Sequence, residues 1–191
     1  MTLILASSSP YRQQLLKKLY LSAEIVPPNI DERAYPNEHP EALARRLSKA
    51  KATAVAQRVN GIIIASDQVA SVDGHILGKP GNARRAIEQL SLCAGKDVTF
   101  FTGLCVYNTR SNHLQVDVVP FSVKFRALTH REIERYVERE QPFDCAGSFK
   151  SEGLGICLFE SLTGDDPNAL IGLPLIRLCA MLRQEGINPL D

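Results

Sequence analysis

The sequence predicts an α/β fold, a sheet flanked by helices, and three stretches of the chain support this prediction. A short apolar run at residues 3–5 leads directly into a helical pattern. The apolar run 62–69 begins with the β-branched residues 62–64, and such a run is typical of a strand buried on both faces. Two strand-like segments, 98–107 and 114–126, follow each other across a polar turn and predict a long hairpin.

The end of the first apolar run has the chemistry of an anion site. Ser9 is a suitable N-cap and Pro10 fits the first position of a helix over residues 9–19. A helix start leaves backbone N–H groups unpaired and carries a partial positive charge, and both favour an anion. Arg12, one turn into the helix, adds donors that match phosphate oxygens. We expect this turn to hold nucleotide phosphates; the alternative is that Ser9 only caps the helix and Arg12 is solvated.

Strands and helices then alternate up to the apolar run 62–69. A short strand over 22–26, a polar loop over 29–39 and an amphipathic helix over 40–59 are expected in turn. Asp67 falls at or near the end of the strand 62–69. Because α/β proteins place ligands at the ends of central strands, Asp67 is a candidate functional residue.

Three further helices are expected, over 82–92, 129–140 and 174–184. Asn82 and Thr129 are suitable N-caps for the first two. The apolar pattern of the last helix predicts that its inward-packed residues are Leu175, Ile176, Leu178, Cys179 and Leu182.

The connections between these elements carry their own signals. Asp73 followed by Gly74 is a hairpin-turn pair. The segment 143–156 contains three glycines with polar residues between them, which indicates a functional loop or a broken strand. A short strand at 157–159 and a turn at 165–168 are expected after it.

Composition limits the classes of protein to consider. With 191 residues, of which 45% are hydrophobic, the chain suits a single globular domain spanning residues 1–191. A net charge of +1 argues against a protein that binds nucleic acid polymers. No signal peptide and no membrane span are found, so we expect a cytoplasmic protein without a membrane partner. The five cysteines form no Cys-x-x-Cys pair, and most are expected to be small core residues in a reducing compartment.

The common catalytic motifs are absent: there is no nucleophile elbow, no zinc-protease motif and no Walker loop. The four histidines are expected at the surface. What remains is a set of acids, bases and hydroxyls at the edges of apolar elements, namely Ser9, Arg12, Glu32, Lys51, Asp67, Lys79, Lys150 and Glu152. The set contains two carboxylates suited to a hard divalent cation and several cations suited to polyphosphate.

These residues fall in short motifs spread over nearly the whole chain. In order, the motifs are Leu5-Ala-Ser-Ser-Ser-Pro-Tyr-Arg12, Asp31-Glu32, Lys51-Ala52, Ser66-Asp-Gln-Val69, Gly78-Lys-Pro80 and Gly172-Leu-Pro174. This pattern closely resembles the Maf family of nucleoside triphosphate pyrophosphatases. The segment 145–153, together with Asp67 and Gln68, resembles the branch of that family that acts on 7-methyl-GTP.

The resemblance implies an inosine-triphosphatase-like fold, an elongated mixed sheet flanked by helices with two lobes around a cleft, and a homodimer. It also implies hydrolysis of a nucleoside triphosphate to the monophosphate and pyrophosphate, with a divalent cation such as Mg²⁺ or Mn²⁺. By the same resemblance Asp67 is the base that activates water, and Glu32 binds the metal together with Asp67.

The resemblance further assigns the substrate contacts. The residues implied for phosphate binding are Ser9, Arg12, Lys51 and Lys79, and those implied for base specificity are Tyr11, Gln68 and Glu152. The positive charge of 7-methylguanine favours stacking on the aromatic ring of Tyr11 and pairing with the carboxylate of Glu152.

Two alternatives remain beside this hypothesis. One is a nucleotide-sensing regulatory protein of cell division that does not turn over its ligand. The other is a pyrophosphatase of the family branch that acts on dTTP and UTP. A phosphotransferase is disfavoured because the chain has no Walker or kinase loop.

Overall fold

The computed structural model describes residues 1–191, which form two compact units. The first unit consists of Met1–Gln68, Thr102–Val119 and Asp166–Asp191, and the second of Val69–Phe101 and Pro120–Asp165. One mixed sheet has the strand order β2-β1-β3-β5-β6-β7, with β4 paired to β3. Three long strands contribute residues to both units: β3 (Ile62–Val72), β5 (Asp97–Asn108) and β6 (His113–Phe125).

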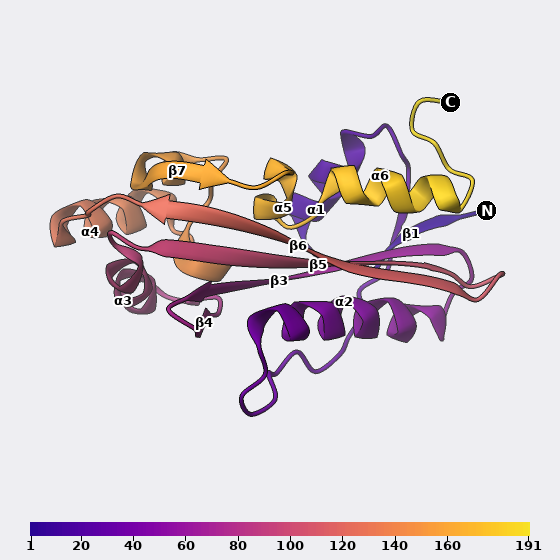
Figure 1. The fold of residues 1–191 in the computed structure, drawn as a ribbon, viewed down its shortest axis with the longest axis horizontal. Helices are drawn as coiled ribbons and strands as arrows, with labels where there is room; N and C mark the ends of the chain where they lie inside the picture. Colours follow the sequence, from indigo (N-terminus) through magenta and orange to yellow (C-terminus); the bar gives the residue numbers. More distant parts are fainter. The chain divides into compact units, whose positions relative to one another are not determined.

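The first unit has helices on both faces of its strands. Its remaining elements are β1 (Leu3–Leu5), α1 (Pro10–Lys17), β2 (Glu24–Ile25), α2 (Pro40–Ala56), α5 (Pro167–Ile171) and α6 (Leu175–Gln184). Strand β1 runs parallel to both β2 and β3. Figure 1 shows α2 on one side of these strands and α1 and α6 on the other.

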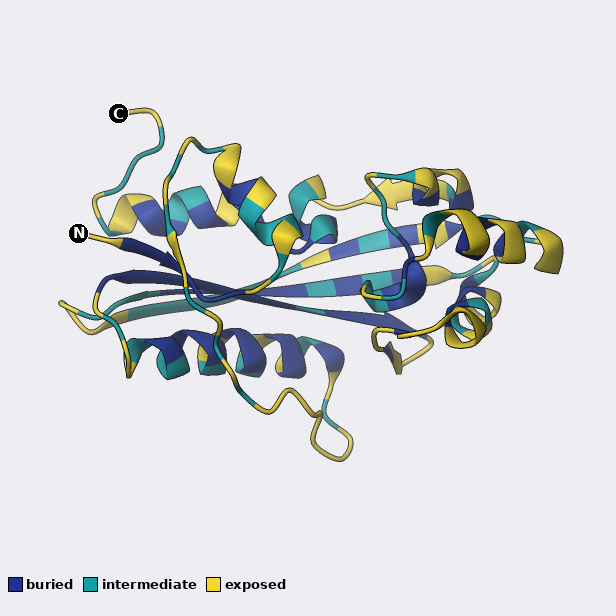
Figure 2. Ribbon diagram, turned by 180° about the vertical axis from the view of Figure 1, so that it is seen from behind, coloured by how far each residue is buried: buried dark blue, intermediate teal, exposed yellow.

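The core of the first unit follows the two-residue period of its strands. Leu5 and Ile64 pack with α1 and α6 on one face, whereas Ile63 and Ala65 pack with α2 on the other. Both faces are therefore buried, which explains why residues 62–65 are all apolar. In Figure 2 the buried side of α2 faces the strands and its other side is exposed.

The second unit contains the shorter elements that follow the long strands. They are β4 (His75–Leu77), α3 (Ala83–Cys93), α4 (His130–Glu140), the 3-10 turns η1 (Ala146–Ser148) and η2 (Leu154–Leu158), and β7 (Phe159–Thr163). Its aromatic core joins Phe100, Phe125, Phe149 and Phe159 in edge-to-face pairs with ring centroids 4.8–5.5 Å apart. The predicted turn at Asp73 and Gly74 is confirmed, since both residues have positive φ (49° and 81°) between β3 and β4.

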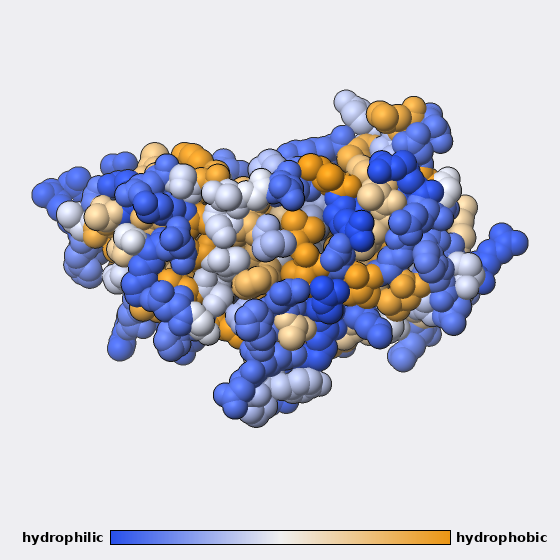
Figure 3. Space-filling view, in the orientation of Figure 1, coloured by the Kyte–Doolittle hydropathy of each residue, from blue (hydrophilic) through white to orange (hydrophobic).

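Most of the predicted elements are confirmed, including the N-caps Ser9, Asn82 and Thr129. The long hairpin of β5 and β6 is also confirmed. The polar loop 29–39 is exposed along almost its whole length, and Figure 3 shows hydrophilic side chains over it, below α2.

Three predictions about the course of the chain are wrong. Strand β3 continues to Val72, so Asp67 lies within the strand rather than at its end. The expected turn at 165–168 instead begins helix α5, because Asp166 caps that helix and Pro167 starts it. The strand expected at 157–159 starts only at Phe159 and runs on to Thr163.

Two predictions about which side chains pack inward are also wrong. Ile176 is 61% exposed, because the buried stripe of α6 runs through Leu175, Leu178, Met181 and Leu182. The cysteines were also misjudged: only Cys93 and Cys105 are buried, although all five are free thiols. None of the helices has the length and apolar character that crossing a membrane requires.

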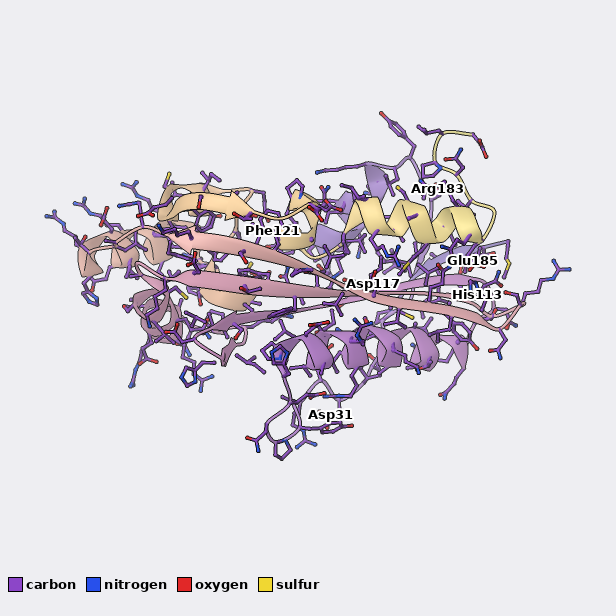
Figure 4. All side chains as sticks on the ribbon, in the orientation of Figure 1. Asp31, His113, Asp117, Phe121, Arg183 and Glu185 are labelled. Carbon is purple, nitrogen blue, oxygen red and sulfur yellow. The ribbon has the colours of Figure 1, made fainter.

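The end of the long hairpin is fastened to α6 through Glu185, whose side chain is only 3% exposed. Its carboxylate accepts hydrogen bonds from Asn108 Nδ2 (2.8 Å) and Gln115 Nε2 (2.7 Å), and His113 Nδ1 lies 2.6 Å from it. Figure 4 shows His113 and Glu185 close together at the end of α6. Burial alone would raise the pKa of Glu185, but these hydrogen bonds lower it below the ordinary glutamate value.

Glu185→Ala is expected to lower the free energy of unfolding by about 1–3 kcal/mol, because Asn108 and Gln115 lose their acceptor. Since the pKa of Glu185 is depressed in the folded state, its contribution is present above the unfolded-state pKa and is lost as pH falls through the folded-state pKa. Urea unfolding at neutral and acidic pH measures both effects. Glu138→Ala, on the exposed face of α4, is the control. An equal loss in both variants would contradict the role of Glu185.

Candidate functional site

Asp67 is a buried carboxylate on a central strand. The two-residue period of β3 turns Ile63, Ala65 and Asp67 toward α2. There Asp67 Oδ1 lies 2.5 Å from Lys51 Nζ, and the two side chains are only 9% and 6% exposed. A charged pair of this kind in the core of an α/β sheet costs desolvation, so it indicates function more than stability.

Lys51 reaches Asp67 from the apolar stripe of α2. Leu47, Lys51 and Val55 are buried at helical spacing, so the stem of Lys51 packs among apolar side chains. The same Lys51 Nζ lies 2.8 Å from Glu32 Oε1, in the loop before α2. The structure therefore brings together three predicted site residues as an acid–base–acid cluster, with Glu32 53% exposed at its outer end.

Burial raises the pKa of Asp67 above the ordinary aspartate value, while the positive charges of Lys51 and Arg12 act in the opposite direction. A carboxylate with a raised pKa accepts a proton more readily near neutral pH than an ordinary aspartate does. The cluster thus contains a carboxylate whose raised pKa suits it to accept a proton.

Arg12 is the second cation near Asp67. Its Nε donates to the carbonyl oxygen of Gly172 at 2.8 Å, which fixes the guanidinium in place. Burial lowers the pKa of Arg12, and the charges of Asp67 and Glu32 oppose that effect. Gly172 has φ 121°, a conformation that L side chains rarely adopt, so the turn that presents its carbonyl depends on glycine.

Ser66 supports the same turn, although sequence reasoning gave it no role beyond its motif. Its buried hydroxyl lies 2.8 Å from the carbonyl oxygen of Gly172 and 2.7 Å from that of Gly103. The alternation along β3 could have indicated it, because Ser66 faces away from Asp67 into the core on the other side of the sheet.

Ser9 and Tyr11 lie at the start of α1. Ser9 Oγ accepts from the backbone N–H of Arg12 at 3.4 Å, so the capping role predicted for Ser9 is confirmed. Tyr11 is half-buried beside Arg12. The roles of Ser9 in phosphate binding and of Tyr11 in stacking remain predictions.

Gln68 uses its amide nitrogen inside the protein. Nε2 donates to the carbonyl oxygens of Ala169 (2.8 Å) and Leu170 (2.9 Å) in α5 and lies 3.2 Å from Thr102 Oγ1. Any contact of Gln68 with a nucleotide base would therefore use its oxygen, Oε1.

The loop that carries Glu32 is held against α2 by Arg46, which sequence reasoning missed. Arg46 pairs with both oxygens of Glu38 at 2.7 Å and donates to the carbonyl oxygen of Arg33 at 3.0 Å. Its guanidinium also stacks on Tyr35, 3.9 Å from the ring centroid. These bonds hold the pKa of Glu38 at about 2. The signal in the sequence was weak, because Arg45 and Arg46 are adjacent and only one faces the loop.

Arg46→Ala is expected to raise the KM for nucleotide roughly 3- to 10-fold with a smaller change in kcat, because Glu32 loses its fixed position. Arg46→Lys keeps the charge but not the two-pronged geometry and should recover only part of the loss. Arg45→Ala is the matched control, since Arg45 makes only an exposed pair with Glu41. Steady-state kinetics of the three variants test this, and equal KM values for Arg45→Ala and Arg46→Ala would contradict it.

Lys79 and Glu152 belong to the second unit, where both are exposed. Lys79 lies between β4 and α3, and Glu152 lies in the segment 143–156, which forms the predicted loop rather than a broken strand. Glu140 of α4 contacts this loop, and its carboxylate accepts a hydrogen bond from the backbone N–H of Leu154 at 2.8 Å. Lys150 is turned toward the same helix and donates to the carbonyl oxygen of Glu140 at 3.3 Å.

The two predicted metal ligands, Glu32 and Asp67, lie in the same cluster. No group of three or more His, Cys, Asp and Glu side chains is gathered in a metal-binding arrangement. Glu32 and Asp67 are nevertheless joined through Lys51, and Mg²⁺ is usually bound by one or two carboxylates together with substrate phosphates. The four histidines are exposed, as expected, and lie outside this cluster.

Comparison with known proteins places these features in a family. The family described as Maf-like protein matches residues 2–185. The chain belongs to the Maf-like family. A curated Maf-like relative from Idiomarina loihiensis, named 7-methyl-GTP pyrophosphatase, is 59% identical over 99% of this chain and 97% of its own. A relative of the same name from Pseudomonas aeruginosa is 55% identical over 97% of both chains.

Solved structures confirm the inosine-triphosphatase-like fold class of this Maf-like chain. The Ham1 protein of Staphylococcus aureus aligns over 97% of this chain and 100% of its own, with a TM-score of 0.56 and 15% identity. A HAM1 protein from Coxiella burnetii aligns over 96% of this chain and 99% of its own, with a TM-score of 0.53 and 12% identity. At these identities the likeness concerns the fold alone.

Proposed function

We propose that the chain is a nucleoside triphosphate pyrophosphatase that hydrolyses 7-methyl-GTP to 7-methyl-GMP and pyrophosphate, and so removes a modified nucleotide. The observation that carries this proposal is the buried carboxylate of Asp67, paired with Lys51 and close to the charge of Arg12. The names of relatives more than 50% identical over almost the whole chain support the choice of substrate.

In the proposed reaction a water molecule attacks the α-phosphorus. A bond forms between the water oxygen and that phosphorus, the bond from the α-phosphorus to the bridging oxygen breaks, and pyrophosphate leaves with the bonding electrons. Asp67 accepts the proton that the water loses. Its raised pKa supports this role, because a stronger base takes the proton earlier in the reaction.

The remaining charge must be balanced by the protein. Arg12 and Lys51 lie beside Asp67, and we assign them to the phosphates together with Ser9 and Lys79. A divalent cation, Mg²⁺ or Mn²⁺, held by Glu32 and Asp67 would neutralise phosphate charge and lower the pKa of a bound water. We assign base recognition to Tyr11, Gln68 and Glu152, with the ring of Tyr11 and the carboxylate of Glu152 suited to the cationic 7-methylguanine.

A pyrophosphate-release assay tests the proposal, with 7-methyl-GTP, GTP, UTP and dTTP as substrates and with or without Mg²⁺ or Mn²⁺. We expect the highest kcat/KM for 7-methyl-GTP in the presence of the metal. A preference for UTP or dTTP would move the chain to the other branch of the family. Binding without turnover would instead favour a nucleotide-sensing protein.

We further propose that the enzyme works in the cytoplasm as a homodimer and needs neither membrane nor nucleic acid polymer. The balanced charge of the chain and the likeness of its sequence to the Maf family support this. Light scattering coupled to size exclusion measures the mass in solution, and a monomer at micromolar concentration would overturn the dimer.

A further inference from the structure

Two functional loops of the second unit meet at one side chain of α3. The Lys79 loop, residues 78–82, precedes this helix, and the Glu152 loop, residues 143–156, packs on it through η1. Gln89 lies on α3 between them and is half-buried. The reaction mechanism above gives this residue no role.

Gln89 makes one hydrogen bond to each loop. Its Nε2 donates to the carbonyl oxygen of Gly78 at 3.1 Å. Its Oε1 accepts from the hydroxyl of Ser148 at 2.5 Å. A side-chain amide has one end that donates and one that accepts, and both ends are used here, so the orientation of the amide is fixed.

Ser148, which donates to Gln89, has an unusual backbone conformation. Ser148 is fully buried and has φ 63°, directly after Gly147 with φ 75°. Glycine adopts a positive φ without strain, but the left-handed conformation of Ser148 costs free energy that its surroundings must offset. Phe149 supplies one anchor in the aromatic core, and Gln89 supplies the other.

The two loops are also joined directly, because the backbone N–H of Gly81 donates to the carbonyl oxygen of Phe143 at 2.9 Å. Gln89 therefore completes a closed set of contacts, in which a shift of one loop is transmitted to the other. Lys79 and Glu152 are the residues of these loops to which phosphate and base recognition are assigned above.

We propose that Gln89 is a positioning residue that couples base recognition in the Glu152 loop to phosphate binding in the Lys79 loop. This inference rests on the proposed function. It makes Gln89 a determinant of specificity for the 7-methylated base that acts through the positions of the two loops. A bound 7-methylated base fixes the position of the Glu152 loop. The hydrogen bonds of Gln89 then fix the position of the Lys79 loop.

Two single variants each remove one of the two hydrogen bonds of Gln89. Gln89→Glu removes the donor to Gly78 while keeping the acceptor for Ser148, and Ser148→Ala removes the other bond. Each should lower the ratio of kcat/KM for 7-methyl-GTP to that for GTP by roughly 3- to 10-fold, the worth of one hydrogen bond. Because the two bonds lie in series through Gln89, losing either one already interrupts the path through this residue, and the double variant should lose no more than the larger single loss. Ser91→Glu adds the same charge on the exposed face of α3 and should leave the ratio unchanged.

Amide hydrogen exchange gives a second readout that does not require turnover. Gln89→Glu, which removes only the bond to Gly78, should speed exchange at Lys150 in the other loop, whose backbone N–H donates to the hydroxyl of Tyr136 at 3.1 Å. An unchanged ratio, losses that add in the double variant, or exchange that changes only beside the substitution would each overturn the coupling. If the wild-type protein turns over neither nucleotide, the proposed function fails, and exchange still decides the role of Gln89.

Discussion

Asp67→Asn is expected to lower kcat for 7-methyl-GTP on the order of 10²-fold or more while nucleotide binding is retained. Asparagine keeps the size and most of the shape of the side chain but cannot take a proton from water. Most of the effect should fall on the chemical step, because Lys51 and Arg12 are still present to hold phosphate and the amide oxygen of asparagine can still bind a hard cation. Nucleotide binding measured by calorimetry should change much less than turnover.

The pH dependence makes this prediction sharper. Turnover requires Asp67 in its deprotonated form, so activity should fall as pH decreases through its pKa. Burial raises that pKa in the free enzyme, and the acid limb of the kcat/KM profile should therefore lie above the ordinary aspartate range. In Asp67→Asn the residual activity should lose this limb.

Asp165→Asn, an exposed substitution of the same chemistry, is the matched control and should leave kcat unchanged. Near-normal turnover in Asp67→Asn would remove Asp67 from the role of base. An acid limb that persists unchanged in the variant would assign the titration to another group.

The sequence predicted the elements whose patterns are local. The caps at Ser9, Asn82 and Thr129 depend on residues within one helical turn, and the hairpin at Asp73 and Gly74 depends on two adjacent residues. Each of these features was correctly placed, because no distant part of the chain is needed to specify it.

Features that depend on tertiary contacts were missed or misplaced. Asp67 looked like a strand end because polar residues interrupt the apolar run there, but pairing with β4 extends β3 beyond it. Asp166 looked like part of a turn, although its carboxylate caps α5 and also accepts from the backbone N–H of Ile176.

In the candidate site, too, the residues could be predicted from the sequence but their tertiary contacts could not. The charged residues could be selected by type and by family resemblance, but their partners could not. Nothing in the sequence pairs Lys51 with both Glu32 and Asp67, since these contacts span 19 and 16 positions of the chain. Arg46, Ser66 and Gln89 hold loops or turns of the candidate site in position. In the sequence they belong to common helix and strand patterns, and only the folded structure distinguishes them from their neighbours.

Lys51→Met is expected to reduce kcat/KM on the order of 10²-fold and to destabilise the protein at the same time. Methionine keeps the unbranched stem in the stripe of α2 but removes the ammonium group between Asp67 and Glu32. Leaving a buried carboxylate without its partner costs several kcal/mol, and because Arg12 remains nearby we expect roughly 3 kcal/mol.

The loss of stability should depend on pH with a definite sign. Removing Lys51 takes away a charge that lowers the pKa of Asp67, so that pKa rises further above its unfolded value. A group with a raised folded-state pKa contributes stability below its unfolded pKa and loses it as pH rises through the folded value. The Tm of Lys51→Met should therefore fall relative to wild type as pH increases.

The double variant Lys51→Met with Asp67→Asn separates the two roles of this pair. It has no unpaired buried charge at Asp67, so its Tm should recover toward the wild-type value and lose the added pH dependence. Its activity should stay as low as that of Asp67→Asn, because the base is absent. If the double variant were no more stable than Lys51→Met, the Asp67–Lys51 pair would not be the source of the loss. A recovery of stability without activity would show that this ion pair is maintained for the reaction, since the fold can dispense with it once both charges are removed.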